Sequence, residues 1–379
     1  MNKLIIIGNG FDLHHNLPTS YGSFIKWLIA QKIKKVSANE PYDDELFRVK
    51  KEDFLDASTQ PVFVKSDEEL VEYLLQNTTE GEDIIFNSNS QLFRCSLHPN
   101  GRFATEIIKN MRTRNWVDIE LEYFRQLSLI LKDYNQVGTK ESAICDLDTL
   151  NQNLKYLIDK LTEYLTEVTG GKRANERFGN LADDPIPSSS IQEKHHLKHL
   201  KDTDYEDPEH KCYIRPQEVL FLNFNYTTLP NQLYGRHRIF KYMNIHGTIQ
   251  DKHRPPIFGY GDEVGEEYAE MEKTNDNRFL SYAKSFAYSQ NSNYSELTRF
   301  IESDSFYVYI WGHSCGLSDR TLLNMIFEHD NCVAIQPFYR ERPGGTDNFT
   351  EIIQNLSRHF KNKQKFRNRL VNKTECSTL

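Results

Sequence analysis

His246 is the residue in this sequence best suited to acid–base chemistry. It follows a candidate strand at 239–245 and precedes Gly247, and imidazole is the side chain whose ordinary pKa lies nearest neutrality. Asn225 lies just beyond an apolar run, 219–222, and its amide is suited to hold a water or a ribose hydroxyl. A purely structural interpretation remains open for both: a histidine hydrogen-bonded in a loop, and an asparagine in an Asx turn.

A second candidate site is the turn that ends the first apolar run of the chain. It comprises Gly8, Asn9, Gly10, Phe11 and Asp12. Strand, glycine turn and helix are how α/β folds hold a phosphate at a helix N-terminus. Asp12 could accept from ribose hydroxyls or cap the helix. The third glycine of the dinucleotide fingerprint is replaced by leucine, so this segment alone fits a ligand site and an ordinary turn equally well.

A third candidate turn follows the apolar run 306–311 and comprises Gly312, His313 and Ser314, with Asp319 at the start of the next helix. His313 has a ligand-binding and a structural interpretation, and Asp319 could simply cap that helix. Apolar runs end in the same way at Asn223, His246 and Gly259. Because ligands of open parallel sheets bind at the carboxyl ends of strands, these turns together predict a nucleotide pocket.

These elements predict an α/β fold with a Rossmann-like, mostly parallel sheet and a large α-helical insertion. We expect residues 1–30 and 216–350 to form the core. Residues 31–215 are the mainly helical insertion, with helices from 115 and over 141–168 and a polar loop at 172–215. Residues 351–379 form a basic C-terminal helix or tail. Three histidines in the polar loop, His195, His196 and His199, are interpreted as surface residues, and no metal is expected.

The composition excludes several classes of protein. The 379 residues carry a formal charge of −8, which disfavours a general nucleic-acid binder. The six cysteines form no Cys-x-x-Cys pair, which fits free thiols in a reducing cytoplasm. Walker A, His-Glu-x-x-His and Gly-x-Ser-x-Gly motifs are absent from the sequence, which disfavours P-loop ATPases, zincins and α/β-hydrolases. We find no signal peptide or membrane-spanning run, and predict a cytoplasmic protein.

The motifs, taken in order along the chain, resemble the bacteriophage abortive-infection family AbiH. The resemblance rests on GNGFDL at 8–13, LPTSY at 17–21, Trp116-x-Asp118-x-Glu120, NFNYT at 223–227, Ile245-His246-Gly247, and Gly312-His313-Ser314 with Asp319.

A more distant resemblance is to sirtuin-like NAD-cleaving proteins of anti-phage defence. It implies NAD as substrate or ligand and catalytic roles for Asn225 and His246. It also implies an NAD pocket lined by Gly8, Gly10, Asp12, Gly312, Ser314 and Asp319. The sequence departs from that pattern at Asn9, which replaces a small residue, and at Thr227, which stands where sirtuin-like proteins often have Asp. The four-cysteine zinc module is missing, which argues against protein deacetylation.

The resemblances imply an anti-phage effector that cleaves NAD+ or a related nucleotide at its N-glycosidic bond. The expected partners are the nucleotide, a phage-derived trigger or a partner defence protein, and a second copy of the chain. One alternative is a non-catalytic sensor that binds a nucleotide. Another is a nuclease that uses Asp118, Glu120 and Glu122 together with the basic tail at 358–373, which holds seven Lys or Arg and no acidic residue.

Overall fold

The computed structural model divides the chain into two compact units. It describes residues 1–37, 42–53, 62–77, 84–88, 91–114, 118–169, 182, 184–193, 205–206, 212–235, 237–251, 254–261, 263 and 265–379. The parallel-sheet unit comprises Met1–Pro18, Val168–Thr274 and Tyr282–Leu379, and the insert unit comprises Thr19–Glu167 and Asn275–Ser281. The predicted polar-loop histidines lie outside the described residues, as does Trp116 of the family motif.

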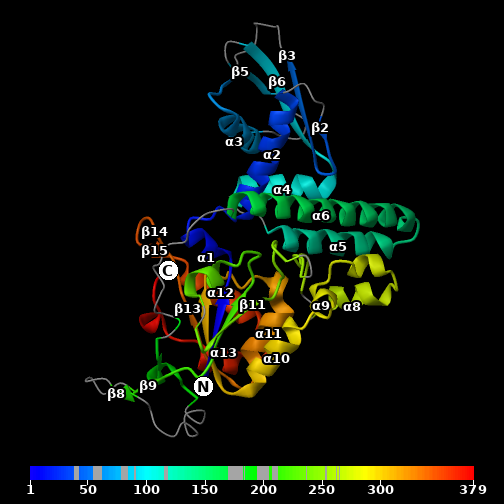
Figure 1. Ribbon diagram of the computed structural model, residues 1–379. Helices are drawn as coiled ribbons and strands as arrows, with labels where there is room; N and C mark the ends of the chain where they lie inside the picture. Colours follow the sequence, from blue (N-terminus) through cyan, green and yellow to red (C-terminus); the bar gives the residue numbers. More distant parts are fainter. Residues whose placement is uncertain are drawn as a thin grey trace. The chain divides into compact units, whose positions relative to one another are not determined.

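A five-stranded parallel sheet forms the centre of the parallel-sheet unit (Figure 1). Its strands are β1 (Asn2–Ile7), β10 (Val219–Asn223), β11 (Phe240–Asn244), β12 (Phe306–Trp311) and β13 (Cys332–Pro337), in the order β11-β10-β1-β12-β13. Strands of this kind read as continuous apolar runs because helices or loops cover both faces. The predicted α/β fold with a parallel central sheet is therefore confirmed.

The strand order creates a switch point between β1 and β12. Counted along the chain, the sheet reads 3-2-1-4-5, so the chain runs outward in opposite directions from β1 and β12. Ile7 is in register with both Asn223 and Trp311, and Asn223 with Asn244. The segments that follow these strands therefore emerge at one edge, where ligands bind in open α/β sheets.

Alternate residues of each strand pack into two hydrophobic layers, because successive side chains of a strand point to opposite faces. Leu4 and Ile6 pack with α10 (Asn293–Ser303), α11 (Arg320–Glu328) and α12 (Phe349–Arg358). Ile5 and Ile7 face the layer that contains α1 (Asn9–His14), α7 (Leu229–Tyr234) and the segment around Ile186 and Ile191. Both layers lie against the same sheet and hold its carboxyl edge in place.

The smaller elements of this unit are short. They are β7 (Ile186–Pro187), β8 (Tyr205–Glu206) and β9 (Cys212–Ile214), which form a three-stranded sheet, the hairpin β14 (Glu341–Arg342) and β15 (Thr346–Asp347), and the helices α8 (Glu266–Lys273), α9 (Lys284–Tyr288) and α13 (Lys363–Arg369). Short 3-10 helices span Ser188–Ser190, Leu317–Asp319 and Lys373–Glu375.

Two local predictions are corrected by this arrangement. Residues 256–258 form no strand; instead Gly259 lies against the Tyr282 carbonyl, and Tyr260 makes an isolated bridge to Ala283. The helix that directly follows the glycine turn is the short α1, and the longer helix that follows it, α2 (Tyr21–Ser37), belongs to the insert unit and not to the predicted 1–30 part of the core. The apolar side chains of 24–29 pack within that unit, for example Phe24 against Tyr164.

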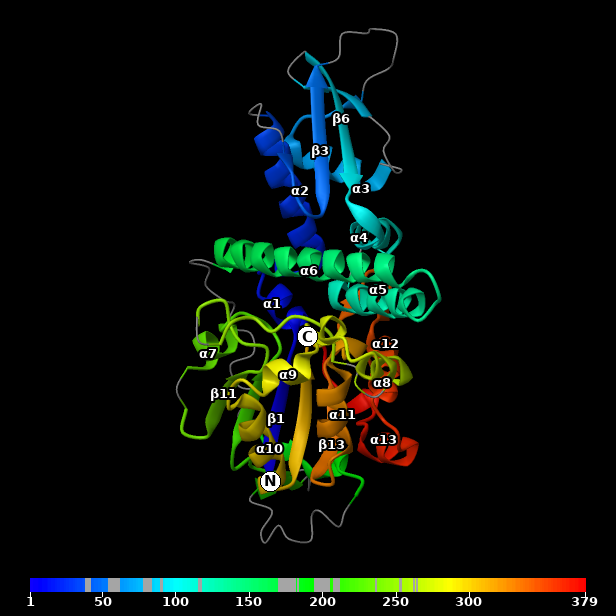
Figure 2. The same cartoon turned by 90° about the vertical axis from the view of Figure 1, so that its right-hand side faces the viewer.

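The insert unit combines helices with a sheet that the sequence did not predict. Its sheet has the order β2-β3-β6-β5-β4, and Figure 2 shows β3 and β6 side by side with α2 next to them. The strands are β2 (Tyr42–Asp43), β3 (Phe47–Asp53), β4 (Val62–Phe63), β5 (Ile84–Ser88) and β6 (Gln91–Pro99). The helices besides α2 are α3 (Asp67–Asn77), α4 (Gly101–Arg114), α5 (Ile119–Tyr134), α6 (Lys140–Thr169) and a 3-10 turn at Asn277–Leu280.

The boundaries of the units differ from the predicted 1–30, 31–215 and 351–379. The first long helix joins the insert unit, because Phe24 and Trp27 contact Tyr164 of α6. The C-terminal segment joins the parallel-sheet unit, because Leu356 and Phe360 are buried in its core. The predicted helix over 141–168 corresponds to α6, which is part of the insert.

Candidate functional site

Two glycine turns are packed against each other at the switch point. The Gly10 N–H donates to the Gly312 carbonyl at 2.8 Å. A Cβ atom on Gly312 would lie 2.2 Å from the Phe11 nitrogen, and one on Gly8 would lie 2.5 Å from the His313 Cα. Gly312 also has a φ of 67°, which favours glycine. The close approach of two backbones therefore accounts for these glycines without a ligand.

A buried cluster of amide and carboxyl groups, which we call the amide cluster, surrounds Asp12. It consists of Asp12, Asn223, Asn225, Thr227 and Asn244. Asn225 Nδ2 donates to Asp12 Oδ1 at 2.9 Å and to the Gly8 carbonyl at 3.0 Å. Thr227 Oγ1 donates to Asp12 Oδ2 at 2.8 Å. Burial raises the pKa of Asp12 to about 7, against the opposing hydrogen bonds from Thr227 and Asn225.

The other amides of this cluster fix the loop that follows β10. Asn223 Nδ2 donates to the Thr227 carbonyl at 2.7 Å, and Asn223 Oδ1 accepts from the Asn225 N–H at 3.0 Å. Asn244 Nδ2 donates to the carbonyls of Asn225 and Thr227 at 3.1 and 2.8 Å. The predicted site residues Asp12, Asn223 and Asn225 are thus brought together, and their side chains hold backbone in place.

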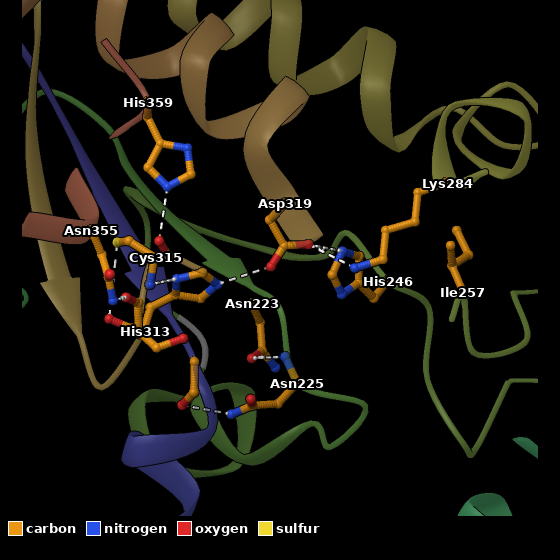
Figure 3. Close-up of polar contacts among 12 residues, drawn as sticks. Asn223, Asn225, His246, Ile257, Lys284, His313, Cys315, Asp319, Asn355 and His359 are labelled. Atoms are coloured by element: carbon orange, nitrogen blue, oxygen red, sulfur yellow. Dashed lines mark hydrogen bonds and ion pairs between the residues drawn. The ribbon is translucent and has the colours of Figure 1, made fainter. Parts of the chain in front are cut away.

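A second cluster, which we call the charged cluster, surrounds Asp319 and consists of Asp319, Lys284, His246 and His313 (Figure 3). Lys284 Nζ lies 2.8 Å from Asp319 Oδ1, His246 Nε2 lies 3.3 Å from the same oxygen, and His313 Nε2 lies 3.5 Å from Oδ2. All four residues are buried, Lys284 at 1% exposure and Asp319 at 8%. Each is placed by its element: His246 and His313 follow β11 and β12, Lys284 begins α9, and Asp319 precedes α11.

The electrostatics of the charged cluster keep Asp319 ionised and His246 neutral. Burial alone would raise the pKa of Asp319, but the Lys284 charge, together with the side-chain hydrogen bonds from His246 and His313, outweighs it and holds that pKa well below its usual range. Burial lowers the pKa of His246, and the neighbouring Lys284 charge lowers it further, against the opposing effect of Asp319. A neutral imidazole beside a carboxylate is the arrangement that a general base requires.

Hydrogen bonds and ring contacts orient the two histidines. The Cys315 N–H donates to His313 Nδ1 at 2.9 Å, so the proton of a neutral His313 ring lies on Nε2, which faces Asp319. His246 Nε2 lies 3.0 Å from the Tyr288 hydroxyl. The Phe224 ring contacts both imidazoles, with centroids 5.1 Å from His246 and 4.4 Å from His313. Phe224 follows β10 and so connects the loop of the amide cluster to the charged cluster.

A cavity of about 270 Å³ lies beside the charged cluster. Its described lining is hydroxyl-rich and includes two carboxyl groups. It comprises Gly261, Glu263, Ser285, Tyr288, Ser289, Tyr294, Asp319, Thr321 and Leu322. His246 is adjacent to the cavity through two of these residues, Asp319 and Tyr288, both within 3.3 Å of its Nε2.

The remaining predicted site residues lie elsewhere. Asn9 and Ser314 are exposed, and the Ser314 carbonyl accepts from Asn355 Nδ2 at 2.8 Å. The Phe11 side chain is wholly buried in the core, stacked on Trp311 at 6.1 Å. Sequence reasoning missed Lys284, Tyr288 and Glu263, which lie in or between charged helical segments that carry no recognisable motif.

Two of the three carboxylates that suggested a nuclease have structural partners in the insert unit. Asp118 caps α5 by accepting from the Leu121 N–H at 3.0 Å, and Glu122 pairs with Arg125 at 3.1 Å. In the part of the chain that the structure describes, no group of three or more His, Cys, Asp or Glu residues is arranged to hold a metal ion.

Residues of the basic tail also bind their own unit. Arg369 donates to the Phe327 and His329 carbonyls at 2.8 and 2.7 Å, and Lys373 pairs with Asp347 at 2.5 Å.

The fold and these clusters define a parallel α/β protein with a buried charged site at the carboxyl edge of its sheet. The chain belongs to the bacteriophage abortive infection AbiH family, whose model matches residues 4–340. The resemblance to AbiH is therefore confirmed, and the family supports an anti-phage role in abortive infection. The likeness to sirtuins stays a prediction. No curated protein and no solved structure matches the chain. Across the described helices, none is long and apolar enough to cross a membrane.

Proposed function

We propose that this protein is an abortive-infection effector that hydrolyses the N-glycosidic bond of NAD+ or a related nucleotide. The observation that carries the proposal is a buried His246 held next to two residues, Asp319 and Tyr288, that line a nucleoside-sized cavity. Ligand pockets of proteins begin at about 300 Å³, and 270 Å³ suits part of a dinucleotide. Family membership supports the biological setting.

The chemistry needs one base and one stabilising anion. The bond between the ribose C1′ and the nicotinamide nitrogen breaks, and nicotinamide leaves with the electron pair and becomes neutral. A water oxygen bonds to C1′, and its proton goes to His246. Because the Asp319 carboxylate can only accept, it favours the tautomer of His246 with hydrogen on Nε2. The basic nitrogen is then Nδ1, so in this proposal the attacking water reaches the ring from the edge opposite Asp319 and Tyr288. Asp319 then stabilises the imidazolium that forms.

Asp319 has a second role in this proposal. The transition state of glycosidic cleavage is oxocarbenium-like, and a carboxylate aimed at a developing positive charge in a water-poor site stabilises it. The low pKa of Asp319 keeps it ionised across the neutral range. Asn225, whose amide donates to Gly8 and Asp12, is assigned here to holding the glycine turn, and its predicted contact with a water stays a prediction.

The test is direct. The chain is purified from uninfected and phage-infected cells and incubated with NAD+, and released nicotinamide is measured by chromatography. We expect release by the protein from infected cells, slowed at least about 100-fold by His246→Gln, which is the usual effect of losing a general base. The matched control is His237→Gln, which changes an exposed histidine of the same unit. Release that is absent from the protein of infected cells, or equal in wild type and His246→Gln, contradicts the proposal.

A further inference from the structure

Five hydroxyl groups line the described part of the cavity, and most of them have already used their hydrogens inside the protein. Three of them donate to protein acceptors: Ser289 Oγ to the Phe286 carbonyl at 2.6 Å, Thr321 Oγ1 to the Gly261 carbonyl at 2.7 Å, and Tyr294 OH to Met325 Sδ at 3.1 Å. A hydroxyl that donates once keeps only lone pairs for a ligand. This part of the lining therefore offers acceptors.

Glu263 adds a stronger acceptor to the same cavity. Its backbone N–H donates to Thr321 Oγ1 at 3.1 Å, which places the residue beside α11. Its Oε1 atom is buried and receives no hydrogen bond from any residue that the structure describes. A buried carboxylate oxygen without a donor destabilises the protein, and a ligand that supplies a donor or a positive charge removes this cost.

The charges around the cavity also favour a ligand that carries positive charge. Asp319 is paired with Lys284 at 2.8 Å, whereas Glu263 has no ion pair among the described side chains. The described lining contains no Lys or Arg, so Glu263 leaves the cavity with an uncompensated negative charge. A phosphate, which carries negative charge and mostly acceptors, has no partner here, while hydroxyls and cationic rings do.

We propose that the cavity binds the cationic, hydroxyl-bearing nucleoside portion of the nucleotide, the N-ribosylpyridinium, and that Glu263 recognises it, with the phosphates outside the cavity. The identity of the nucleotide rests on the proposed function. The chemical class of the bound group rests on the acceptor-rich lining and on the unpartnered Glu263 oxygen. Glu263 is then a specificity-determining residue, distinct from His246, which takes the proton.

The experiment uses nicotinamide riboside, which is cationic and has no phosphate, and measures its binding to the full chain by calorimetry. Nicotinic acid riboside is the second probe, because its ring carboxylate cancels the pyridinium charge. We expect wild type to prefer nicotinamide riboside at least tenfold. Glu263→Gln should weaken its binding at least tenfold and reduce the preference to threefold or less. The matched control, Glu267→Gln, changes an exposed carboxylate four residues away and should bind within twofold of wild type.

The inference is overturned if Glu263→Gln, shown to be folded by a cooperative urea transition, binds nicotinamide riboside within twofold of wild type. It is also overturned if wild type binds inorganic pyrophosphate as tightly as nicotinamide riboside. Its failure is separable from failure of the proposed function. If riboside binding depends on Glu263 but NAD+ is not cleaved, the proposed hydrolase activity is contradicted and this inference stands. If Glu263→Gln cleaves NAD+ at the wild-type rate, the hydrolase activity stands and this inference is contradicted.

Discussion

The amide cluster and the charged cluster lie at the same edge of one sheet but are built from opposite chemistry. In the amide cluster, carbonyls, amides and one buried carboxyl with a pKa of about 7 satisfy one another. In the charged cluster, an ionised Asp319 faces Lys284 and two histidines beside a cavity. Burying full charges is expensive unless they are paired. The contacts of the first cluster are those of structural support, and the second cluster is the one to which we assign chemistry in the proposed function.

Loss of Lys284 gives the largest expected effect, because it leaves the Asp319 carboxylate buried without its ammonium. We expect Lys284→Met to lower the free energy of unfolding by about 3–5 kcal/mol at pH 7, measured by urea titration. The control is Lys26→Met, which removes an exposed pair with Glu72 whose side chains are 49% and 54% exposed, and should change stability by less than about 1 kcal/mol.

The pH dependence of the Lys284 effect has a defined sign. The folded pKa of Asp319 is lowered, so its stabilisation is present above the unfolded pKa of about 4 and is lost as the pH falls through the folded value. Lys284→Met should therefore differ least from wild type in strong acid. Equal stability of the two proteins at pH 7 would show that the ion pair between Lys284 and Asp319 does not stabilise the fold.

Gly312→Ala tests whether the glycine turns at the switch point are needed for packing. The added Cβ would lie 2.2 Å from a backbone nitrogen at a φ of 67°, and we expect a loss of about 3 kcal/mol or more in urea unfolding. Gly345→Ala is the matched control, since its φ is 76° with nothing within 4 Å, and it should cost about 1 kcal/mol. Equal losses of unfolding free energy in the two variants would mean that the close contact between the two glycine turns is not needed for packing.

Asp12→Asn probes the amide cluster through pH. The folded pKa of about 7 lies above the unfolded one, so the ionised form is disfavoured in the folded state. Wild-type stability therefore falls between about pH 4 and 7 because of this group. Relative to wild type, Asp12→Asn should gain about 2–3 kcal/mol between pH 5 and pH 8, by urea unfolding at both values. The control Asp159→Asn, at an exposed position, should show no such gain. If the stability difference between Asp12→Asn and wild type does not change with pH, the pKa of Asp12 lies in its ordinary range.

Tyr288→Phe has the smallest expected effect. It removes the hydroxyl that lies 3.0 Å from His246 Nε2 and keeps the ring that stacks on that imidazole. We expect a loss of about 1 kcal/mol in unfolding free energy. Tyr339→Phe, whose ring contacts Lys373 and Phe349, should stay within about 0.5 kcal/mol. A stability change in Tyr288→Phe no larger than in the control means that this hydrogen bond contributes nothing to folding.

The parallel sheet could be predicted from the sequence because four of its five strands carry an apolar run that ends at a glycine or a polar residue. The exception is β11, which has Lys241 inside it. The sheet of the insert unit could not, because β3 holds only two apolar residues, Phe47 and Val49, among five charged ones. Asp12, Asn225, His246 and His313 could be found from the sequence because each lies in a segment that follows a strand. Lys284 and Glu263 were missed because their partners lie 35 and 58 residues away, and only the folded chain brings them together.

The most direct test of the division between the two clusters compares one variant from each in the nicotinamide-release assay at pH 7, with protein purified from infected cells. The account predicts that His246→Gln releases nicotinamide at least about 100-fold more slowly than wild type. It predicts that Asp12→Asn stays within about threefold of wild type, because the Asp12 side chain hydrogen-bonds to Asn225 and Thr227 of its own cluster. Wild-type release by His246→Gln, or loss of release in folded Asp12→Asn, would contradict it.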